Sequence, residues 1–537
     1  MGVTAKTRPP PKLFALDLNC AIYYCVHKLQ KRTPYDPINN ARWEEEIITS
    51  VVTYIKYMTA QVKPTEMLYI AVDGVAPMAK IRQQRVRRFK SAVGAEEEAK
   101  VRAAARGVPY VPQSRWDTNA ITPGTQFMAN LALALRAYAK TDSEKIIVSP
   151  ADEPGEGEQK IMEYIRKYPT NDAVIYGLDA DLIVLALWAH ATRGMSIDLF
   201  REEVEFSGGV KEDTFGDPQF LYMNISHLAG CLHQTYGIPT QSKQAFLQDF
   251  VGLMSVLGND FVPHGMALKI RDEGIEHVLS LYKSTLPKPV IEATGAGAGA
   301  GAGASTGYAY NRAALQALFT WLEAEEPRLL LNSVRKKLEA RVGSTANKDP
   351  EGQALARHND TPVLWAAEAP LVERVHVPGD ERPRTQLRST WRQTYDELAL
   401  QGAVPRKAAE GYLDSLTWTL AYYSGAAVDN HWYYPWLLPP RAGTIRALLE
   451  SGALTKSPAQ IRTPLKPIEQ LAMVLPQSSF NLLPVELHGL PKQNPHAWPQ
   501  AWPYYSFGRR FLWECEPQIP LIEPEQIKAW IEAAYDE

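Results

Sequence analysis

The sequence predicts an α/β fold, in which a parallel sheet is flanked by helices and a second, mostly helical and coil-rich region packs against it. Over residues 1–285, short apolar runs alternate with longer stretches of helical composition. This alternation is the pattern of repeated strand–helix–strand units with a parallel sheet. From residue 308 onward the chain shows helical patterns first and then segments rich in Trp, Tyr and Pro.

The elements of the first region can be placed in order along the chain. The apolar runs LFAL, LYIAV, IIVS and AVIYGL predict strands at 13–18, 67–72, 145–149 and 173–178. Helical composition between them predicts helices at 42–61, 78–107, 123–140 and 157–167. In the second region, helices are predicted at 313–342 and 391–424, with polar, irregular chain at 343–390.

A strict Gly-Ala repeat separates the two regions. Gly295–Ala304 alternates two residues without bulky side chains, so it cannot bury enough apolar surface to offset the entropy of ordering. We therefore interpret residues 286–307 as a flexible linker or a long surface loop. The predicted domains are residues 1–285, this linker, and residues 308–537.

Composition excludes several classes of protein. Lys and Arg total 57 against 60 Asp and Glu, a formal charge of −3, so any basic binding site must be local rather than general. Four scattered cysteines predict reduced thiols and an intracellular protein. No apolar stretch reaches the roughly 18 residues that a membrane span needs. The absence of a clear basic tail favours the cytoplasm over the nucleus.

Acidic residues follow four of the predicted strands. Asp17 follows the first, Asp73 the second, Glu156 and Glu158 the third after a short turn, and Asp179 and Asp181 the fourth. The C-terminal edge of an open parallel sheet is where ligand sites form. A later segment, LGNDFVPH, adds a seventh carboxylate at Asp260.

Seven carboxylates at one edge would repel one another unless cations neutralised them. Ligand sets made only of oxygen select hard cations such as Mg²⁺ or Mn²⁺. Two such ions about 3.5–4 Å apart are the usual apparatus for phosphodiester hydrolysis. Any one of these acids could instead be a helix cap or a solvated loop residue, but four strands rarely all end in acids by chance. The predicted catalytic and metal-ligating residues are Asp17, Asp73, Glu156, Glu158, Asp179, Asp181 and Asp260.

A basic helix follows Asp73. Residues 80–90 hold six basic side chains and no acid. Helical spacing predicts that one face carries Lys80, Gln84, Arg87 and Arg88. Arg binds phosphate bidentately and Lys adds a point charge, so this face suits the terminal phosphate of a nucleic acid. A solvated helix face and a nuclear localisation signal are the two alternatives.

These segments resemble the Xrn family of 5′→3′ exoribonucleases, in both of that family's signature regions. The combination of VDGVAP, a QQRxRRF run, ITPGT, PGEGE and GLDADLI is highly specific. The resemblance is nearly continuous over residues 13–264 and recurs from 391 to 537. The matching stretches are FALDLNCAIYYC, AVDGVAPMAKIRQQRVRRF, DTNAITPGTQFM, EPGEGEQKIMEYIR, YGLDADLIVLAL, FREEV, LGNDFVPH, WTLAYYSGAAVDNHWYYPW and MVLPQSS.

The resemblance implies a PIN-like sheet of the kind shared with flap nucleases, and a two-metal, Mg²⁺-dependent enzyme for which Mn²⁺ can substitute. Such an enzyme degrades single-stranded RNA processively from a 5′-monophosphate end to mononucleotides, as in mRNA decay. It implies that the seven acids hold the metals and that Lys80, Gln84, Arg87 and Arg88 grip the 5′-phosphate. Because the large members continue with further domains, the chain resembles a minimal form of the family. Protein partners are not indicated.

The sequence departs from the family pattern in the first motif. The family usually has Gly and then His where this chain has Cys20 and Tyr23. That His stacks on the first base, and Tyr23 can stack too, at about 1–3 kcal/mol per base. We expect Trp432 to supply the other face of the stack, with Trp418 and Trp436 as alternatives. A packing role in the core remains open for Tyr23 and for each Trp.

Two other functions compete with this interpretation. The first is a structure-specific 5′ flap-type DNA nuclease, which would share the sheet and the acids but would carry a Gly-rich helix-hairpin-helix, and we find none after Asp260. The second is an inactivated nuclease fold used as a binding or structural protein. That function predicts lost carboxylates, whereas all seven are present.

Overall fold

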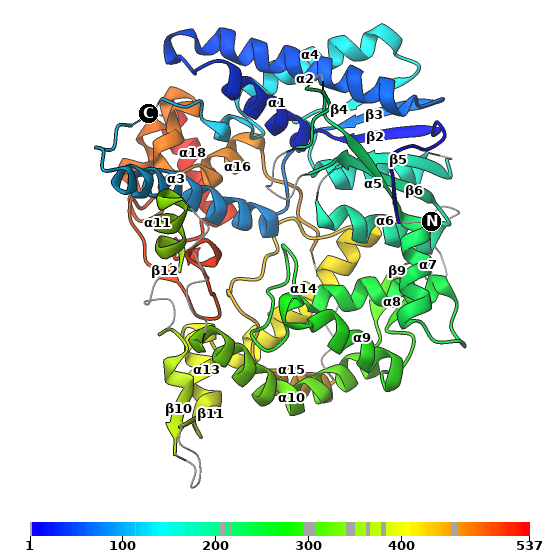
Figure 1. Cartoon of the computed structure of the whole chain (residues 1–537), viewed down its shortest axis with the longest axis vertical. Coiled ribbons are helices and arrows are strands. Elements are labelled where there is room, and N and C mark those ends of the chain that lie inside the picture. Colours follow the sequence, from blue (N-terminus) through cyan, green and yellow to red (C-terminus); the bar gives the residue numbers. More distant parts are fainter. Residues whose placement is uncertain are drawn as a thin grey trace.

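The computed structural model of the chain describes residues 3–112, 114–168, 170–177, 179–204, 210–214, 216–294, 307–339, 349–360, 366–376, 383–452 and 460–536. The predicted α/β architecture is confirmed. A seven-stranded sheet lies at the centre of the first region, with helices on both of its faces (Figure 1). No helix among the described residues is both long and apolar enough to cross a bilayer.

The sheet has the strand order β1-β7-β6-β5-β2-β3-β4. The five strands from β6 to β4 pair in parallel, whereas β7 and β1 add an antiparallel edge. All four predicted strands are present, and three further strands of the sheet, β6, β7 and β1, were missed. The strands are β1 Thr4–Ala5, β2 Leu13–Asp17, β3 Met67–Ala71, β4 Ile146–Ser149, β5 Asp172–Tyr176, β6 Ser196–Glu202 and β7 Phe220–Asn224.

Alternating side chains of the central strand supply two cores. Leu13 and Ala15 of β2 face the core that α5, α6 and α8 cover, whereas Phe14 and Leu16 face the core of α1, α2 and α4. Because both faces are covered, the strand is continuously apolar, as is usual in parallel sheets. The helices are α1 Leu18–Arg32, α2 Asn40–Val62, α3 Met78–Arg106, α4 Gln126–Ala139, α5 Gly157–Lys167, α6 Ala180–Arg193, α7 Ile225–Tyr236, α8 Lys243–Val256 and α9 Gly274–Ser284.

The second region is mostly helical and packs on the first, as predicted. Helix α14 packs against α6 and α8, and its buried residues belong to the same core as β2. The predicted helix at 391–424 is broken at residues 401–404, and the stretch expected to be irregular contains α11 and a β-hairpin. The elements are α10 Arg312–Glu339, α11 Pro350–Asn359, β10 Val372–Val375, β11 Arg384–Leu387, α13 Trp391–Leu400, α14 Pro405–Ser424, α15 Ala442–Glu450, α16 Pro467–Val474, α17 Leu490–Gln493, β12 Tyr504–Tyr505, β13 Glu516–Pro517 and α18 Pro524–Asp536.

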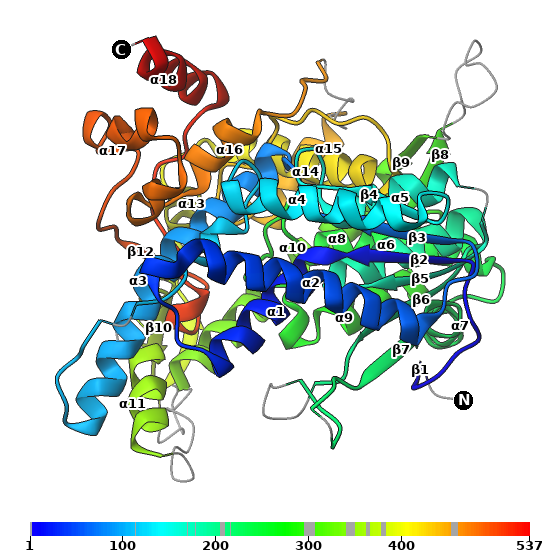
Figure 2. The ribbon, with the colours of Figure 1, turned by 90° about the horizontal axis from the view of Figure 1, so that it is seen from above.

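The Gly-Ala segment itself, Gly295–Ala304, lies outside the described residues. The chain on either side of it forms an antiparallel pair, β8 (Ile291–Thr294) with β9 (Gly307–Tyr310). Figure 2 shows this hairpin at the edge of the molecule that lies farthest from α11. The division into residues 1–285, 286–307 and 308–537 stays a prediction.

Helix α3 joins the two regions. Its buried residues, including Ile81 and Phe89, pack in a core with α16 and α18. Arg85 is 1% exposed, and its guanidinium donates hydrogen bonds to the carbonyl oxygens of Met473, Ala497 and Pro520. The far end of the helix lies beside α11 (Figure 2), to which Arg106 is bound through Glu351 at 2.6 Å. Arg85, one of the six basic residues at 80–90, therefore holds the second region against α3.

Arg85→Leu should destabilise the protein by about 3 kcal/mol or more, because it leaves several buried carbonyls without a donor. Chemical denaturation, followed by tryptophan fluorescence, measures this change. The matched control on the same helix is Arg106→Ala, which removes an exposed ion pair and should lower the free energy of unfolding much less. Equal losses from the two variants would show that Arg85 does not hold the regions together.

Candidate active site

The predicted acids gather where the parallel strands end. Asp17 ends β2, and Glu156 and Asp179 stand at the N-caps of α5 and α6. A helix cap was the alternative role for such residues, but none of these three N-cap side chains makes a capping hydrogen bond. The three carboxylates therefore do not serve as helix caps, and they stand at helix N-termini, where the helix dipoles favour negative charge.

Local contacts fix the second acid, Asp73. Asn19 Nδ2 donates to one carboxylate oxygen of Asp73 at 2.7 Å, and the backbone N–H of Gly157 donates to the other at 2.7 Å. A Cβ at Gly157 would lie 2.6 Å from Asp17 Oδ1 and 3.3 Å from Asp73 Oδ1. Glycine is therefore required here, because any side chain would enter the space between the two acids.

Lys80 lies within the acid cluster rather than at a distance from it. Its Nζ is 2.8 Å from Glu156 Oε2 and 2.7 Å from Asp260 Oδ2. Burial alone would lower the pKa of Lys80, but Glu156 and Asp260 together outweigh it and hold the pKa well above its usual value. Lys80 thus carries a full positive charge between two predicted metal ligands, and it links the acids to the basic helix.

The carboxylates act on one another throughout the cluster. Burial raises the pKa of Asp17 well above its usual value, and the charges of Asp73 and Asp179 raise it further. Burial and Glu156 have the same effect on the pKa of Glu158. Burial and Asp260 raise the pKa of Asp181 to about 6. The seven acids therefore form one electrostatic group, as the sequence predicted.

The residues fit divalent cations. Two carboxylate oxygens, Asp17 Oδ1 and Glu158 Oε1, are buried with no hydrogen-bond partner among the described residues. An unpartnered buried oxygen is costly unless a cation or a donor completes it. The donor set is mainly carboxylate oxygen, which suits hard ions. Among the described residues, Asp17, Cys20 and Asp179 have donor atoms close enough to share one ion, and a metal-ligating role for all seven acids stays a prediction.

The metal-free protein should lose stability as the pH rises from about 4 to about 6. Because its pKa is raised, the carboxyl of Asp181 is held in its protonated form more strongly in the folded state than in the unfolded state. Its contribution to the stability of the fold is therefore complete below the ordinary pKa of 3.8, and it is lost as the pH rises through about 6. Added Mg²⁺ should therefore stabilise the protein more at about pH 7 than at about pH 4. Asp181→Asn should flatten this difference in urea denaturation, and equal stabilisation by Mg²⁺ at both pH values would contradict the clustering.

The structure places the basic face of α3 in three environments. Gln84 is partly buried, and its Oε1 has no hydrogen-bond partner among the described residues. Arg88 donates to Thr122 and to Asn119 Oδ1 in the segment DTNAITPGT, and burial lowers its pKa to about 10. Arg87 is exposed. Lys80, within the acid cluster, is the third environment, so the four residues of this helix face differ in what they contact.

A cavity of about 290 Å³ opens beside the acids, between α3 and the second region. Arg87 and Gln83 line it together with Asp260. Gln83 Nε2 donates to Asp260 Oδ1 at 2.7 Å, so the helix holds this acid through two side chains, Lys80 being the other. Asp260 is the predicted acid that lines this cavity, so the cavity joins the exposed cation of α3 to one member of the cluster.

The two predicted stacking residues come from different cores. Tyr23 packs on the core of α1 and α2, and it interacts with Arg88, which places it near the basic helix. Trp432 stacks on Trp418 with ring centroids 5.4 Å apart, and Trp418 stacks on Tyr422 at 4.9 Å. Among the described residues, no ring contact joins Tyr23 to Trp432. Their role in binding a base stays a prediction.

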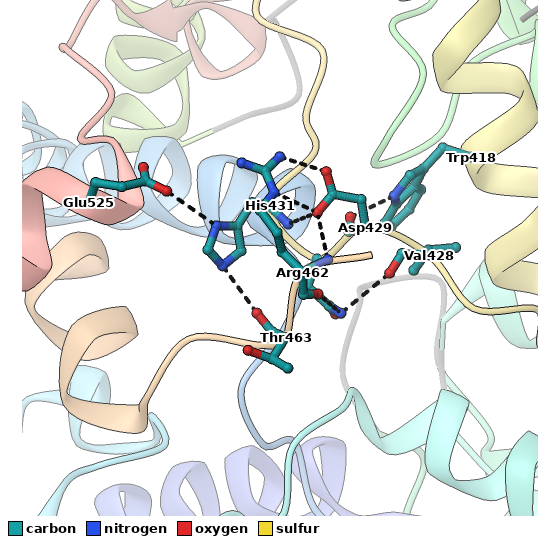
Figure 3. Close-up of polar contacts among 8 residues, drawn as sticks. Trp418, Val428, Asp429, His431, Arg462, Thr463 and Glu525 are labelled. Carbon is teal, nitrogen blue, oxygen red and sulfur yellow. Dashed lines mark hydrogen bonds and ion pairs between the residues drawn. The ribbon is translucent and has the colours of Figure 1, made fainter. Parts of the chain in front are cut away.

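Polar contacts anchor the segment that carries Trp432 (Figure 3). Arg462 donates to both carboxylate oxygens of Asp429, at 2.9 and 2.6 Å, and Trp418 Nε1 donates to the Asp429 carbonyl oxygen at 3.0 Å. Next in the chain, the Asn430 carbonyl oxygen accepts a hydrogen bond from the Met78 N–H. The second region therefore caps the first turn of α3, at the entrance to the site.

Sequence reasoning missed three residues that position the acids. Tyr422 donates its hydroxyl to Glu156 Oε1 at 2.7 Å from the second region. Asn19 and Gln83 hold Asp73 and Asp260, as described above. All three lie inside the motifs FALDLNC, QQR and WTLAYYSG, so position within a motif was the available signal.

Comparison with known proteins matches the chain in two places. A family model described as "XRN 5'-3' exonuclease N-terminus" matches residues 5–203, and one described as "Xrn1 helical domain" matches residues 392–537. The human protein named 5'-3' exoribonuclease 1 is 28% identical over 95% of this chain and 32% of its own length. The chicken protein named 5'-3' exoribonuclease 2 is 26% identical over 97% of the chain and 65% of its own length.

Another relative is more similar to this chain over a shorter alignment. The fission yeast (Schizosaccharomyces pombe) protein named 5'-3' exoribonuclease 2 is 35% identical over 51% of this chain and 31% of its own length. The chain thus spans between about a third and two thirds of the length of these relatives. Because both matched regions follow one another in order, and relatives align over nearly all of it, the chain belongs to the Xrn family of 5′→3′ exonucleases.

Proposed function

We propose that this chain is a Mg²⁺-dependent, processive 5′→3′ exoribonuclease. It would degrade RNA with a 5′-monophosphate to mononucleotides by two-metal hydrolysis, with Mn²⁺ as a possible substitute ion. The observation that carries the proposal is Lys80, which lies 2.8 Å from Glu156 and 2.7 Å from Asp260 at the start of the basic helix. Lys80 contacts two predicted metal ligands and belongs to the helix that is predicted to bind phosphate, so both functions meet in one site. The names of the relatives support RNA as the substrate.

The chain's own residues divide the work. Divalent cations, when bound, supply Lewis acidity and a water that is activated for attack. The acids hold those charges at the sheet edge, while Asn19, Tyr422 and Gln83 fix the orientation of three of the acids. Arg87 and Arg88 would bind the terminal phosphate and so position the first phosphodiester at the acids.

The competing functions predict different outcomes of one digestion experiment. A flap-type DNA nuclease would cut a branched DNA, and a binding protein would cut nothing. The test is digestion of a 5′-monophosphate RNA beside a DNA flap, each with Mg²⁺ and with a chelator. We expect Mg²⁺-dependent loss of the RNA and an intact flap. Cleavage of the flap in preference to the RNA, or no cleavage of either, would reject the proposal. A cytoplasmic location is part of the proposal and is tested by imaging the tagged chain.

Tyr23→Ala should weaken processivity more than it slows cleavage of a single nucleotide. Loss of a stacking surface costs about 1–3 kcal/mol of binding to one base. The ratio of fully digested RNA to prematurely released RNA, measured with a trap for free enzyme, reports this effect. The matched control is Tyr23→Phe, which keeps the ring and should keep the ratio. If Tyr23→Ala keeps the ratio too, Tyr23 is a packing residue.

A further inference from the structure

We propose that Cys20 adds a thiolate to the acid cluster, so that thiophilic divalent cations such as Zn²⁺ and Cd²⁺ bind there in competition with Mg²⁺. The competition with Mg²⁺ rests on the proposed function, whereas the binding of a soft ion at Cys20 does not. The site would be a mixed sulfur–oxygen site made of Cys20, Asp17 and Asp179.

The geometry brings these three residues together. The Cys20 sulfur and one carboxylate oxygen from each of Asp17 and Asp179 lie within 4.8 Å of one another. The ligands of one tetrahedral zinc ion lie about 3.6 Å apart, because the bonds are about 2.0–2.3 Å long. Side-chain shifts of about 1 Å or less therefore allow all three atoms to bind the same ion.

The fold explains why the sulfur points to this place. Asp17 is the N-cap of α1 and Cys20 lies in the first turn of that helix, while Asp179 is the N-cap of α6 on the neighbouring strand connection. Strands β2 and β5 are paired in parallel, with Leu16 opposite Tyr176, so the two helix starts are adjacent. Cys20 as a residue is partly exposed.

A second observation points to a cation at the same place. Asp17 is 6% exposed, and its Oδ1 is buried with no hydrogen-bond partner among the described residues. A buried carboxylate in that condition favours a neighbouring positive charge. Oxygen ligands alone would select hard ions, but a thiolate shifts the preference toward Zn²⁺ and other soft ions.

The test is a titration of the reduced, metal-free chain with Cd²⁺, because thiolate–cadmium bonds give a charge-transfer band in the ultraviolet. Wild type should develop the band and saturate at one ion per chain. Cys20→Ser should lack it, and Cys231→Ser, which removes the other partly exposed cysteine, should keep it. Asp179→Asn should weaken Cd²⁺ binding by about tenfold or more, the scale of losing even an outer partner of a metal ligand.

Several results would overturn the proposal. A full band in Cys20→Ser would assign the sulfur to another cysteine, and Cd²⁺ binding without a band in wild type would exclude a thiolate ligand. A further Cd²⁺ titration of wild type, in excess Mg²⁺, does not depend on how the variants fold. Mg²⁺ should raise the Cd²⁺ concentration at which half of the sites are filled. An unchanged midpoint would place the soft ion outside the acid cluster. A chain that shows the band but does not digest RNA would reject the proposed function while keeping the sulfur–oxygen site.

Discussion

Glu158→Gln is expected to abolish hydrolysis while leaving the metal-free fold at least as stable as wild type. Glu158 is 5% exposed, its Oε1 has no hydrogen-bond partner among the described residues, and its pKa is raised by burial and by Glu156. A neutral amide of the same shape removes one charge from a repelling group, and it can donate to neighbouring carboxylates. Asp179→Ala should behave in the same direction, because it also removes a metal ligand.

We expect Glu158→Gln to lower activity by more than the roughly 10–100-fold that follows removal of an outer partner of a metal ligand. Single-turnover digestion at saturating Mg²⁺ measures it, and urea denaturation of the metal-free variants measures stability. The control is Glu163→Gln on the same helix, an exposed residue bound to Lys167, which should change neither activity nor stability by much. Retention of more than a few per cent of activity in Glu158→Gln would remove Glu158 from the metal site.

Arg87→Ala should reduce the preference for a 5′-monophosphate end. Arg87 is exposed and lines the cavity beside Asp260, so its truncation leaves the acids and the core unchanged. A lost charge-assisted, bidentate contact costs about 1.5–3 kcal/mol, which corresponds to roughly 10–150-fold in rate on the monophosphate RNA. The rate on a 5′-hydroxyl RNA should change little, because that end never made the contact.

The measurement is a comparison of two enzymes on two RNA ends at one salt concentration. Lys100→Ala is the matched control, since Lys100 is an exposed cation on the same helix that is bound to Glu96 rather than to the site. Equal losses on both ends would make Arg87 a general contact to the RNA backbone, and that loss would disappear at high salt. Arg88 is a poorer choice for this test, because its bonds to Thr122 and Asn119 give it a structural role.

The central sheet could be predicted because its strands carry a strong local signal. Each of β2 to β5 is a run of mostly apolar residues that is followed by a helix, and β2, β3 and β5 are buried on both faces. Strands β6, β7 and β1 were missed, although β6 is as buried as the others. It contains Asp198, which forms an ion pair with Arg8, and Glu202, which accepts hydrogen bonds from Tyr54 and Tyr176; these partners are distant in sequence.

The candidate site could be predicted as far as its residues follow strand ends. The acids could be expected to meet because parallel strands share one edge, and that inference needs only the order of elements. Tyr422 could not be placed at Glu156, because the two are 266 residues apart and belong to different regions. The docking role of Arg85 was hidden for the same reason: a run of six basic residues does not show which of them will face carbonyls of the second region.

One digestion tests the central claim, that the acid cluster cuts RNA from a bound 5′ end. The same 5′-monophosphate RNA is labelled at its first nucleotide in one sample and at its last in another, and both are digested with excess RNA over enzyme. The account predicts that the first label appears at once as a mononucleotide, while the last label passes from full-length RNA to small product without a ladder of intermediates. Early release of the last label, or internal fragments, would contradict it.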